Sequence, residues 1–262
     1  MAITEAEALH RLAIIRRLEA ASFRAFPATS TVYDGTWAVR LTGSYGAKRL
    51  NSVNPLDPSD HLDVAARIER ARARFDAAGR PLLFRLSPLA PQALVDHLDA
   101  EGWSAFDHSV VFMAELAEAA LDVRVERIPM RDLPRYVAAS LSVHDKPLDQ
   151  SEGLSEVLTA IKPPAAFFVQ ECPRGEPIAV AMAIHDNDLA GVLDVAVSPD
   201  WRRQGIARDL VANALRYTAL KGARIGWLQV EAANEAGIAL YRGLGFREAY
   251  RYVYRAPPGD AR

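Results

Sequence analysis

The chain lacks the features that mark disulfide-stabilised, membrane-spanning and strongly basic proteins. It has one cysteine, Cys172, so it can form no internal disulfide, and a reducing cytoplasm is the expected compartment. No apolar run approaches the ~20 residues that a membrane-spanning helix needs. Glu5 and Glu7 precede any apolar run, which argues against a signal peptide. A formal net charge of -2 argues against a surface that binds nucleic acid by general positive charge.

Two common nucleotide-binding motifs are absent as well. The sequence has no Gly-x-x-x-x-Gly-Lys-Ser/Thr loop for a nucleoside triphosphate and no Gly-x-Gly-x-x-Gly for a dinucleotide. What the chain does have is a globular composition, with 50% hydrophobic and 24% charged residues. Its 262 residues correspond to one large domain or two small ones.

The hydrophobic pattern predicts alternating helices and strands, an α/β (α+β) architecture. The first helix has a capping box in Thr4 and Glu7 and stops before Pro27. The predicted helices cover 3–25, 62–78, 91–100, 130–141, 151–161, 203–221 and 234–243. The predicted strands cover 37–41, 50–53, 81–86, 109–115, 123–128, 166–171, 177–185, 190–197, 224–230 and 247–255.

The two halves of the chain repeat one order of elements. An amphipathic helix ends at Gly79 in the first half and at Gly222 in the second, and a strand, a helix and a further strand follow each. This rhythm predicts a diverged internal duplication, with two unrelated strand–helix–strand units as the alternative. The acidic, alanine-rich stretch 114–121 is the best boundary, which gives an N-terminal domain over 1–119 and a C-terminal domain over 120–262.

The turn between the strand over 190–197 and the next helix carries the clearest chemical signal. Gly205 leaves room for a ligand to approach the backbone. The N–H groups at a helix start and the helix dipole attract anions. Arg202, Arg203 and Arg208 add positive charge. The segment therefore predicts a phosphate or pyrophosphate site, and the alternative is a solvated, arginine-rich turn.

Several motifs together resemble the GNAT family of acetyl-CoA-dependent N-acetyltransferases. Arg202-x-x-Gly205-x-Ala207 follows an apolar strand, and Asn234 and Leu240-Tyr241-x-x-Leu244-Gly245-Phe246 come later. The resemblance covers residues ~120–256. It implies a mixed, mostly antiparallel sheet flanked by helices, complete in the C-terminal half and partial in the N-terminal half. It also implies acetyl-CoA as co-substrate and no metal.

The resemblance implies a role for each matched position. Asn234 would contact the cofactor, or alternatively only cap its helix, and Tyr241 would protonate the departing thiolate, or alternatively belong to the core. The two are seven residues apart and so share a helix face. Backbone groups of three residues would follow the pantetheine arm: Val195, Ala196 and Val197. Amides beside Arg202 would cradle the pyrophosphate: Arg203, Gln204, Gly205, Ile206, Ala207 and Arg208.

The group that takes the proton from the acceptor amine stays open. Several family members carry a glutamate five residues before the asparagine, but here that residue is Gln229, which cannot serve. Asp194 comes first, because some polyamine-acetylating members are acidic at this strand position, and its alternative is a hydrogen-bonded strand-end carboxylate. Glu231 and Glu171 follow.

Two further segments bear on the acceptor. The family's acceptor pocket is lined by the region that here contains His144 and Asp145, so both are candidate acceptor contacts, with a solvated loop as the alternative. In the first half, the loop over 51–63 has no glycine, two prolines and three aspartates. Such a loop repels phosphate, so no second acetyl-CoA site is expected there. That half is instead expected to support the catalytic domain and to wall the acceptor pocket.

The function that follows is acetyl transfer from acetyl-CoA to a primary amine by direct attack. The acceptor is a small molecule or a protein, with no nucleic acid or membrane involved, and the oligomeric state is open. A noncatalytic acyl-CoA-sensing or partner-binding GNAT-fold module is the alternative, because the glutamate is missing at Gln229. An acyl group longer than acetyl is a third possibility.

Overall fold

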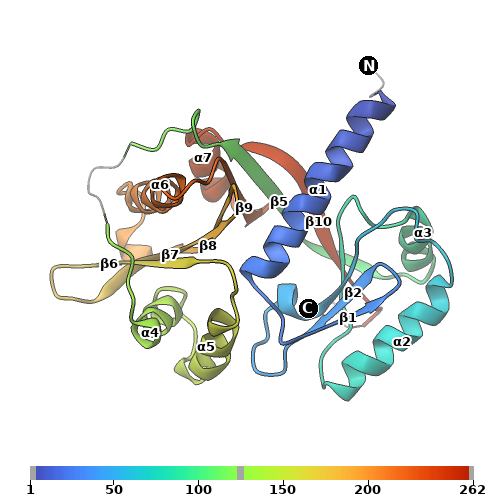
Figure 1. The fold of residues 1–262 in the computed structure, drawn as a ribbon. Coiled ribbons are helices and arrows are strands. Elements are labelled where there is room, and N and C mark those ends of the chain that lie inside the picture. The colour runs from blue at the N-terminus through green and yellow to red at the C-terminus, as the bar shows by residue number, and fades with distance from the viewer. Residues whose placement is uncertain (1–3, 123–126, 260–262) are drawn as a thin grey trace.

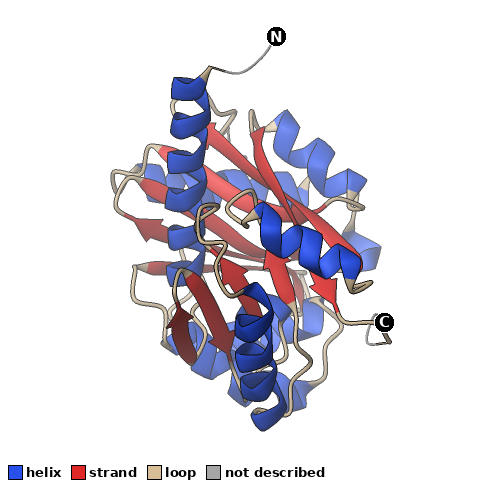
Figure 2. Cartoon of the chain, turned by 90° about the vertical axis from the view of Figure 1, so that its right-hand side faces the viewer, coloured by secondary structure: helices blue, strands red, loops and turns tan. Residues whose placement is uncertain are grey.

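The computed structural model describes residues 4–122 and 127–259. Helices lie on both sides of a large sheet (Figures 1 and 2). The helices are α1 (Glu5–Ala25), α2 (Val64–Ala77), α3 (Gln92–Ala100), α4 (Leu133–Val143), α5 (Ser151–Thr159), α6 (Ile206–Ala219) and α7 (Glu235–Gly243). The strands are β1 (Ser30–Asp34), β2 (Trp37–Leu41), β3 (Ser52–Pro55), β4 (Phe84–Leu86), β5 (Ser104–Glu115), β6 (Ala165–Glu171), β7 (Pro177–Asp186), β8 (Leu189–Val197), β9 (Ile225–Glu231) and β10 (Arg247–Ala256).

Most of these elements lie where the sequence predicts them. The capping box is confirmed: Thr4 Oγ1 accepts a bond from the Glu7 amide, and the Glu7 carboxylate accepts one from the Thr4 amide. Strand β1 was not predicted, because four of its five residues are exposed and no buried face shows in the pattern. The strand predicted over 50–53 is wrong at its start, where a 3₁₀ turn, Lys48–Leu50, precedes β3. The strand predicted over 123–128 falls largely on 123–126, outside the described residues.

The two halves of the chain share one ten-stranded sheet and exchange their last strands. The strand order is β1-β2-β3-β4-β10-β5-β9-β8-β7-β6. Thus β5, which ends the first half, pairs with β9 of the second half, while β10, which ends the second half, pairs with β4 of the first. Each half has one parallel pair, β3 with β4 and β8 with β9, and the last strand of the other half lies beside it. The division at 119/120 stays a prediction, and the sheet runs across it.

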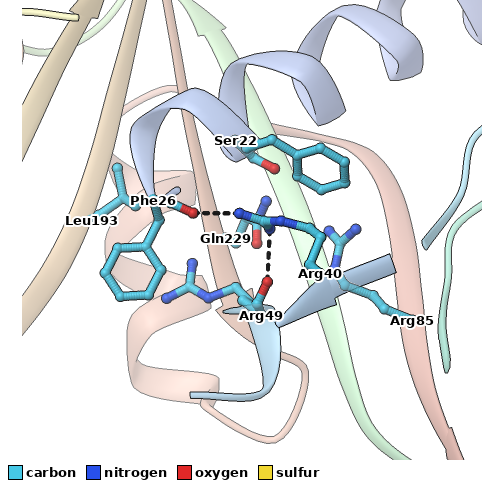
Figure 3. A pocket seen from close by; sticks show the side chains of 8 residues that line it. Ser22, Phe26, Arg40, Arg49, Arg85, Leu193 and Gln229 are labelled. Atoms are coloured by element: carbon cyan, nitrogen blue, oxygen red, sulfur yellow. Dashed lines mark hydrogen bonds between the residues drawn. The ribbon is translucent and has the colours of Figure 1, made fainter. Parts of the chain in front are cut away.

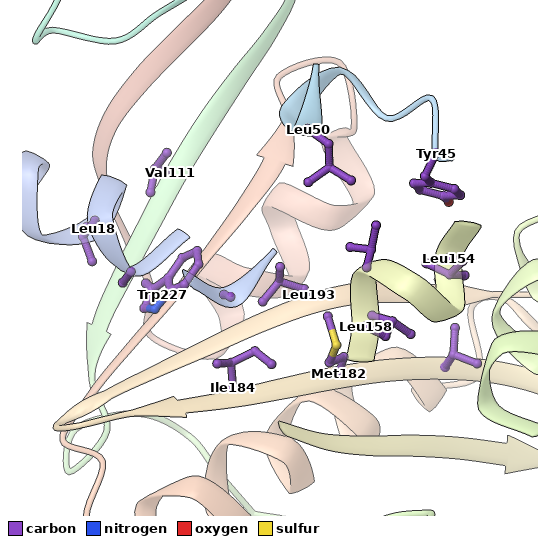
Figure 4. Close-up of a cluster of buried hydrophobic side chains, with 14 of the residues drawn as sticks. Leu18, Tyr45, Leu50, Val111, Leu154, Leu158, Met182, Ile184, Leu193 and Trp227 are labelled. Atoms are coloured by element: carbon purple, nitrogen blue, oxygen red, sulfur yellow. The ribbon is translucent and has the colours of Figure 1, made fainter. Parts of the chain in front are cut away.

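The buried side chains form a layer on each face of this sheet. On one face, α1, α4 and α5 pack on residues such as Leu193 and Trp227 (Figure 4). On the other, α6 packs on Val192 and Leu228, and α2 and α3 pack on Phe84. Helix α1 belongs to the first half but crosses to the second, where Ile15 and Leu18 join the cluster that contains Leu193. No helix in the described part of the chain is long and apolar enough to cross a membrane.

Candidate active site

The parallel strands β8 and β9 separate in the middle of the sheet. They pair from Leu189 and Ile225 to Val192 and Leu228, and beyond these residues each strand pairs only with its other neighbour. A bulge accompanies the separation, since Asp194 and Val195 lie opposite the single residue Ala181 of β7. Asp194 has the left-handed φ of 54°. The backbone of Val195–Val197 therefore borders an opening between two strands at their carboxyl ends, a common ligand position in α/β sheets.

The turn before α6 leaves a set of backbone donors without partners. The helix begins at Ile206 rather than at the predicted residue 203, because the left-handed residues Arg203 (φ 64°) and Gly205 (φ 81°) precede it. Within the described chain, no group accepts a hydrogen bond from the six backbone N–H groups of residues 203–208. Three of these residues, Arg203, Gln204 and Gly205, are exposed and precede the helix, so a ligand can reach the turn. The geometry is that of an anion site.

The arginines of this turn differ in their contacts. Arg202 Nε donates to the carbonyl of Val197 at 3.0 Å, which ties the turn to the end of β8. Arg208 Nη1 donates to the carbonyl of Gly243 at 3.0 Å and so links α6 to the end of α7. No hydrogen bond or ion pair of the Arg203 side chain occurs among the described residues, which leaves its charge available.

Asn234 and Tyr241 lie at the two ends of α7. Asn234 Oδ1 accepts a bond from the Gly237 amide at 2.8 Å, so its predicted alternative role as a helix cap is confirmed, and cofactor contact stays a prediction. Tyr241 is buried against Phe112 and Phe246, in the cluster that also contains Val192 and Leu228, where the strands part. Burial raises the pKa of Tyr241 to about 12, so its phenol is protonated at neutral pH.

Asp194 is held by three side chains from one face of α4 and its C-terminal cap. Tyr136 Oη and Ser140 Oγ each donate to Asp194 Oδ2 at 2.7 Å, and His144 Nε2 lies 2.9 Å from Oδ1. Burial by itself would raise the pKa of the Asp194 carboxyl, but the contacts with His144, Tyr136 and Ser140 outweigh it and lower the pKa. The geometry of Asp194 is therefore that of the predicted alternative to a catalytic base, a hydrogen-bonded carboxylate.

The pairing of His144 with Asp194 was missed by sequence reasoning, which considered the two residues separately. A signal for it exists in the sequence. Tyr136, Ser140 and His144 are spaced by four residues, so they lie along one helix face and can meet one carboxylate. Asp145, the other predicted acceptor contact, is exposed beyond the end of α4 with a φ of 53°.

The remaining predicted bases lie in different places. Glu231 is exposed at the end of β9 and lines a cleft. Gln229 lines the same cleft, and its Oε1 accepts a bond from Tyr252 Oη at 3.1 Å. Glu171 ends the edge strand β6 and forms an ion pair of 2.5 Å with Arg135, so the structure does not bring it to the cleft.

The cleft lies between the two halves of the chain and has a volume of about 290 Å³. A second, smaller cavity of about 10 Å³ adjoins it below the end of α1 (Figure 3), and Arg49 and Gln229 line both. The first half contributes these residues to the cleft: Ala47, Lys48, Arg49, Asp107 and Ser109. The second half contributes Gln229, Val230, Glu231, Tyr252 and Tyr254. The first half thus forms part of a wall next to the separated strands.

In the loop over 51–63 of the first half, Asp57 and Asp60 contact other residues of the same half. Asp60 accepts a bond from the Arg67 side chain at 2.8 Å and bonds from the backbone and hydroxyl of Thr36, and these contacts hold the pKa of Asp60 well below its usual range. Asp57 is paired with Arg16. Among the residues that the structure describes, no group of three or more His, Cys, Asp or Glu could hold a metal ion.

The sheet is mixed, its parallel strands β8 and β9 separate, and the helix beside them begins with backbone amides that have no partner among the described residues. Together these features define the GNAT class of folds. A GCN5-related N-acetyltransferase from Kribbella flavida aligns with a TM-score of 0.69 at 18% identity, over 94% of this chain and 96% of that one. A tandem GNAT protein from the clavulanic acid biosynthesis pathway aligns with a TM-score of 0.64 at 14% identity, over 94% and 89%. At these identities the likeness shows the fold.

Residues 12–255 match the model of the family described as "Probable histone acetyltransferase Rv0428c C-terminal", and the chain belongs to that family. The resemblance to the GNAT family drawn from the motifs is thereby confirmed. The [ribosomal protein bS18]-alanine N-acetyltransferase of Escherichia coli K12 is 44% identical over 76 residues, which are 29% of this chain. The mycothiol acetyltransferase of Nocardiopsis dassonvillei is 33% identical over 108 residues. The chain spans 51% of the first relative's length and 32% of the second's.

Proposed function

We propose that this chain is an acetyl-CoA-dependent N-acetyltransferase that moves an acetyl group to a primary amine by direct attack. The observation that carries the proposal is the opening between β8 and β9 next to the six unpartnered amides before and within the first turn of α6. A long molecule with a pyrophosphate at one end and a thioester at the other fits this combination. Relatives that are named N-acetyltransferases support it.

The binding roles follow from the donors and acceptors that the structure leaves open. The amides of residues 203–208 and the Arg203 side chain would hold the pyrophosphate, because they combine hydrogen-bond donors with positive charge. The backbone of Val195–Val197 would follow the pantetheine arm along the opening. Asn234 still has its side-chain amide N–H groups for the cofactor while its oxygen caps α7.

In the reaction, the neutral amine attacks the thioester carbonyl, the carbon–sulfur bond breaks, and the thiolate leaves. The buried Tyr241 phenol would donate its hydrogen bond, and finally its proton, to the departing sulfur. Tyr241 suits this role because it is protonated at every pH at which proteins commonly act. Water exclusion around its ring strengthens that hydrogen bond.

For the base, we propose His144 oriented by Asp194. Asp194 by itself is a poor proton acceptor, since two hydroxyls donate to it, His144 lies 2.9 Å away, and its pKa is lowered. His144 Nε2 lies 2.9 Å from Asp194 Oδ1, which leaves Nδ1 as the ring nitrogen that would accept the proton of the amine. Leu193, next to Asp194 in the chain, lines the small cavity that adjoins the cleft. This supports a position of the His144–Asp194 pair near the acceptor. Glu231 at the cleft is the second candidate.

The test is thiol release from acetyl-CoA with a panel of primary amines, next to a calorimetric titration with acetyl-CoA. The proposal expects binding and turnover with at least one amine. The name of one relative, a [ribosomal protein bS18]-alanine N-acetyltransferase, suggests a peptide with an alanine amine as one member of the panel. Binding without turnover across the panel would instead favour the noncatalytic acyl-CoA-sensing module, which the glutamine at position 229 makes the second candidate. Absence of binding would contradict both.

A further inference from the structure

The small cavity below α1 is surrounded by more positive than negative side chains. Arg40, Arg49 and Arg85 all line it. Arg85 is neutralised, because its guanidinium donates to both oxygens of Glu19 at 2.5 and 3.0 Å. Glu19 also accepts a bond from Tyr250 Oη, so its acceptor capacity is largely used. Arg40 and Arg49 therefore have no carboxylate partner among the residues that the structure describes.

Arg40 is buried, with 3% of its surface exposed. Its guanidinium donates to the carbonyls of Phe26 and Arg49 at 2.6 and 2.7 Å (Figure 3) and stacks on Phe23, while its Nε has no partner among the described groups. Burial and the nearby charge of Arg85 lower the pKa of Arg40 to about 9. A buried charge that no carboxylate balances is costly, so it requires compensation.

Arg49 is half-buried and lines both the small cavity and the cleft. Its guanidinium stacks on the Phe26 ring at 5.4 Å, and its side chain forms no hydrogen bond or ion pair with any described residue. The neighbouring Lys48 differs, because it is paired with Asp107. Arg49 is thus the cleft cation whose donors stay available, and Arg40 lies behind it.

We propose that the acceptor carries an anionic group, a carboxylate or a phosphate, in addition to its amine, and that Arg49 binds that group where the cleft meets the small cavity. This inference rests on the proposed function and names its substrate class. The small cavity holds about one water, so the anionic group lies on the cleft side. The planar guanidinium binds carboxylate or phosphate through two parallel bonds, and the positive potential of Arg40 strengthens the contact.

The experiment compares amines in matched pairs with and without the anionic group. One arm uses L-amino acids against their C-terminal amides, and the other uses O-phosphoethanolamine against ethanolamine, so the arms distinguish carboxylate from phosphate. In the better arm we expect the wild type to show at least a ~10-fold higher kcat/KM for the anionic member, which corresponds to one bidentate contact. Arg49→Gln should remove this preference without lowering kcat/KM for the neutral member, and Arg49→Lys should restore part of it.

The control is Arg74→Gln, which neutralises an exposed arginine on α2 and should leave the preference unchanged. Arg40 is not used, because its bonds to two carbonyls hold the end of α1 and its loss would affect folding. Equal kcat/KM within the pairs in both arms, or an equal loss for both members in Arg49→Gln, would overturn the inference.

Failure of the proposed function is a separate result. If no amine is turned over, the inference is measured by binding instead, in protein saturated with CoA so that the start of α6 is occupied. Sodium phosphate and β-alanine should then raise the thermal midpoint of the wild type more than that of Arg49→Gln, at ionic strength matched with potassium chloride. Identical responses of the two proteins would refute the anionic subsite.

Discussion

Gly205 has a left-handed backbone conformation and lies where the pyrophosphate would bind. Its φ of 81° lies in the left-handed region, where a side chain costs roughly 1–2 kcal/mol. Gly205→Glu adds a negative charge where the pyrophosphate would lie, so we expect acetyl-CoA affinity to fall by about 100-fold or more, or about 2.7 kcal/mol. Calorimetric titration measures this. Gly205→Ala brings the same backbone strain without the charge and should lose far less affinity; equal losses in the two variants would contradict a charge effect.

Tyr241 offers a test of leaving-group protonation. We expect Tyr241→Phe to lower kcat by about 10²-fold while the dissociation constant of acetyl-CoA changes little, because the ring still fills its place in the core. Since burial raises the pKa of Tyr241 to about 12, the phenol keeps its proton up to pH 10, so the variant should change the rate without moving an alkaline limb below that pH. Steady-state kinetics from pH 6 to 10 checks both statements. Tyr217→Phe on α6 is the matched control, and equal losses in kcat and binding would indicate a packing role for Tyr241.

At the scale of elements, helix α4 is fastened to the bulge of β8 through one carboxylate. Asp194→Ala leaves the hydroxyls of Tyr136 and Ser140, which are 0% and 2% exposed, without their acceptor. Each such group costs about 1–3 kcal/mol, so the free energy of unfolding should fall by about 3 kcal/mol. Urea denaturation measures the loss. Ser140→Ala, which removes a single donor, should cost about 1 kcal/mol.

The same contact has a defined pH dependence. The folded-state pKa of Asp194 is lowered, so its carboxylate stabilises the fold above the unfolded-state value of about 3.9, and the contribution disappears as pH falls through the folded-state pKa. The stability difference between the wild type and Asp194→Ala should therefore shrink as pH falls below 4. A difference that grows between pH 4 and pH 2 would show that the contact has the opposite sign.

At the scale of the whole molecule, the exchange of β5 and β10 couples the two halves. Residues 120–262 alone lack β4 and β5, so one side of β9 and both sides of β10 would be left unpaired. We expect this fragment to aggregate or to lack a cooperative thermal transition, whereas the full chain should unfold in one step. Residues 102–262, which include β5, should behave better in the same circular-dichroism melts and size-exclusion runs. A monomeric, cooperatively folded 120–262 fragment that binds acetyl-CoA would show that the predicted boundary also divides folding.

Signals that act within a few residues predict their elements from the sequence, and contacts between distant residues do not. Helices such as α1 and α6 follow from periodicity, capping and glycine stops, because these signals act within a few residues. The turn before α6 and the position of Tyr241 on α7 follow from short motifs for the same reason. The exposed strand β1 escaped prediction, since it has no buried face to leave a pattern.

The sequence by itself determined most of the elements, the family and the turn around Gly205, all of which depend on residues close together in the chain. Only the tertiary structure decided that β5 and β10 change places, that His144 reaches Asp194, and that Arg49 of the first half lines a cleft with Gln229 of the second. The physical reason is that these contacts join residues far apart in sequence. Strand pairing and packing select such contacts; the spacing of Tyr136, Ser140 and His144 predicts a shared helix face, but not the residue that this face meets.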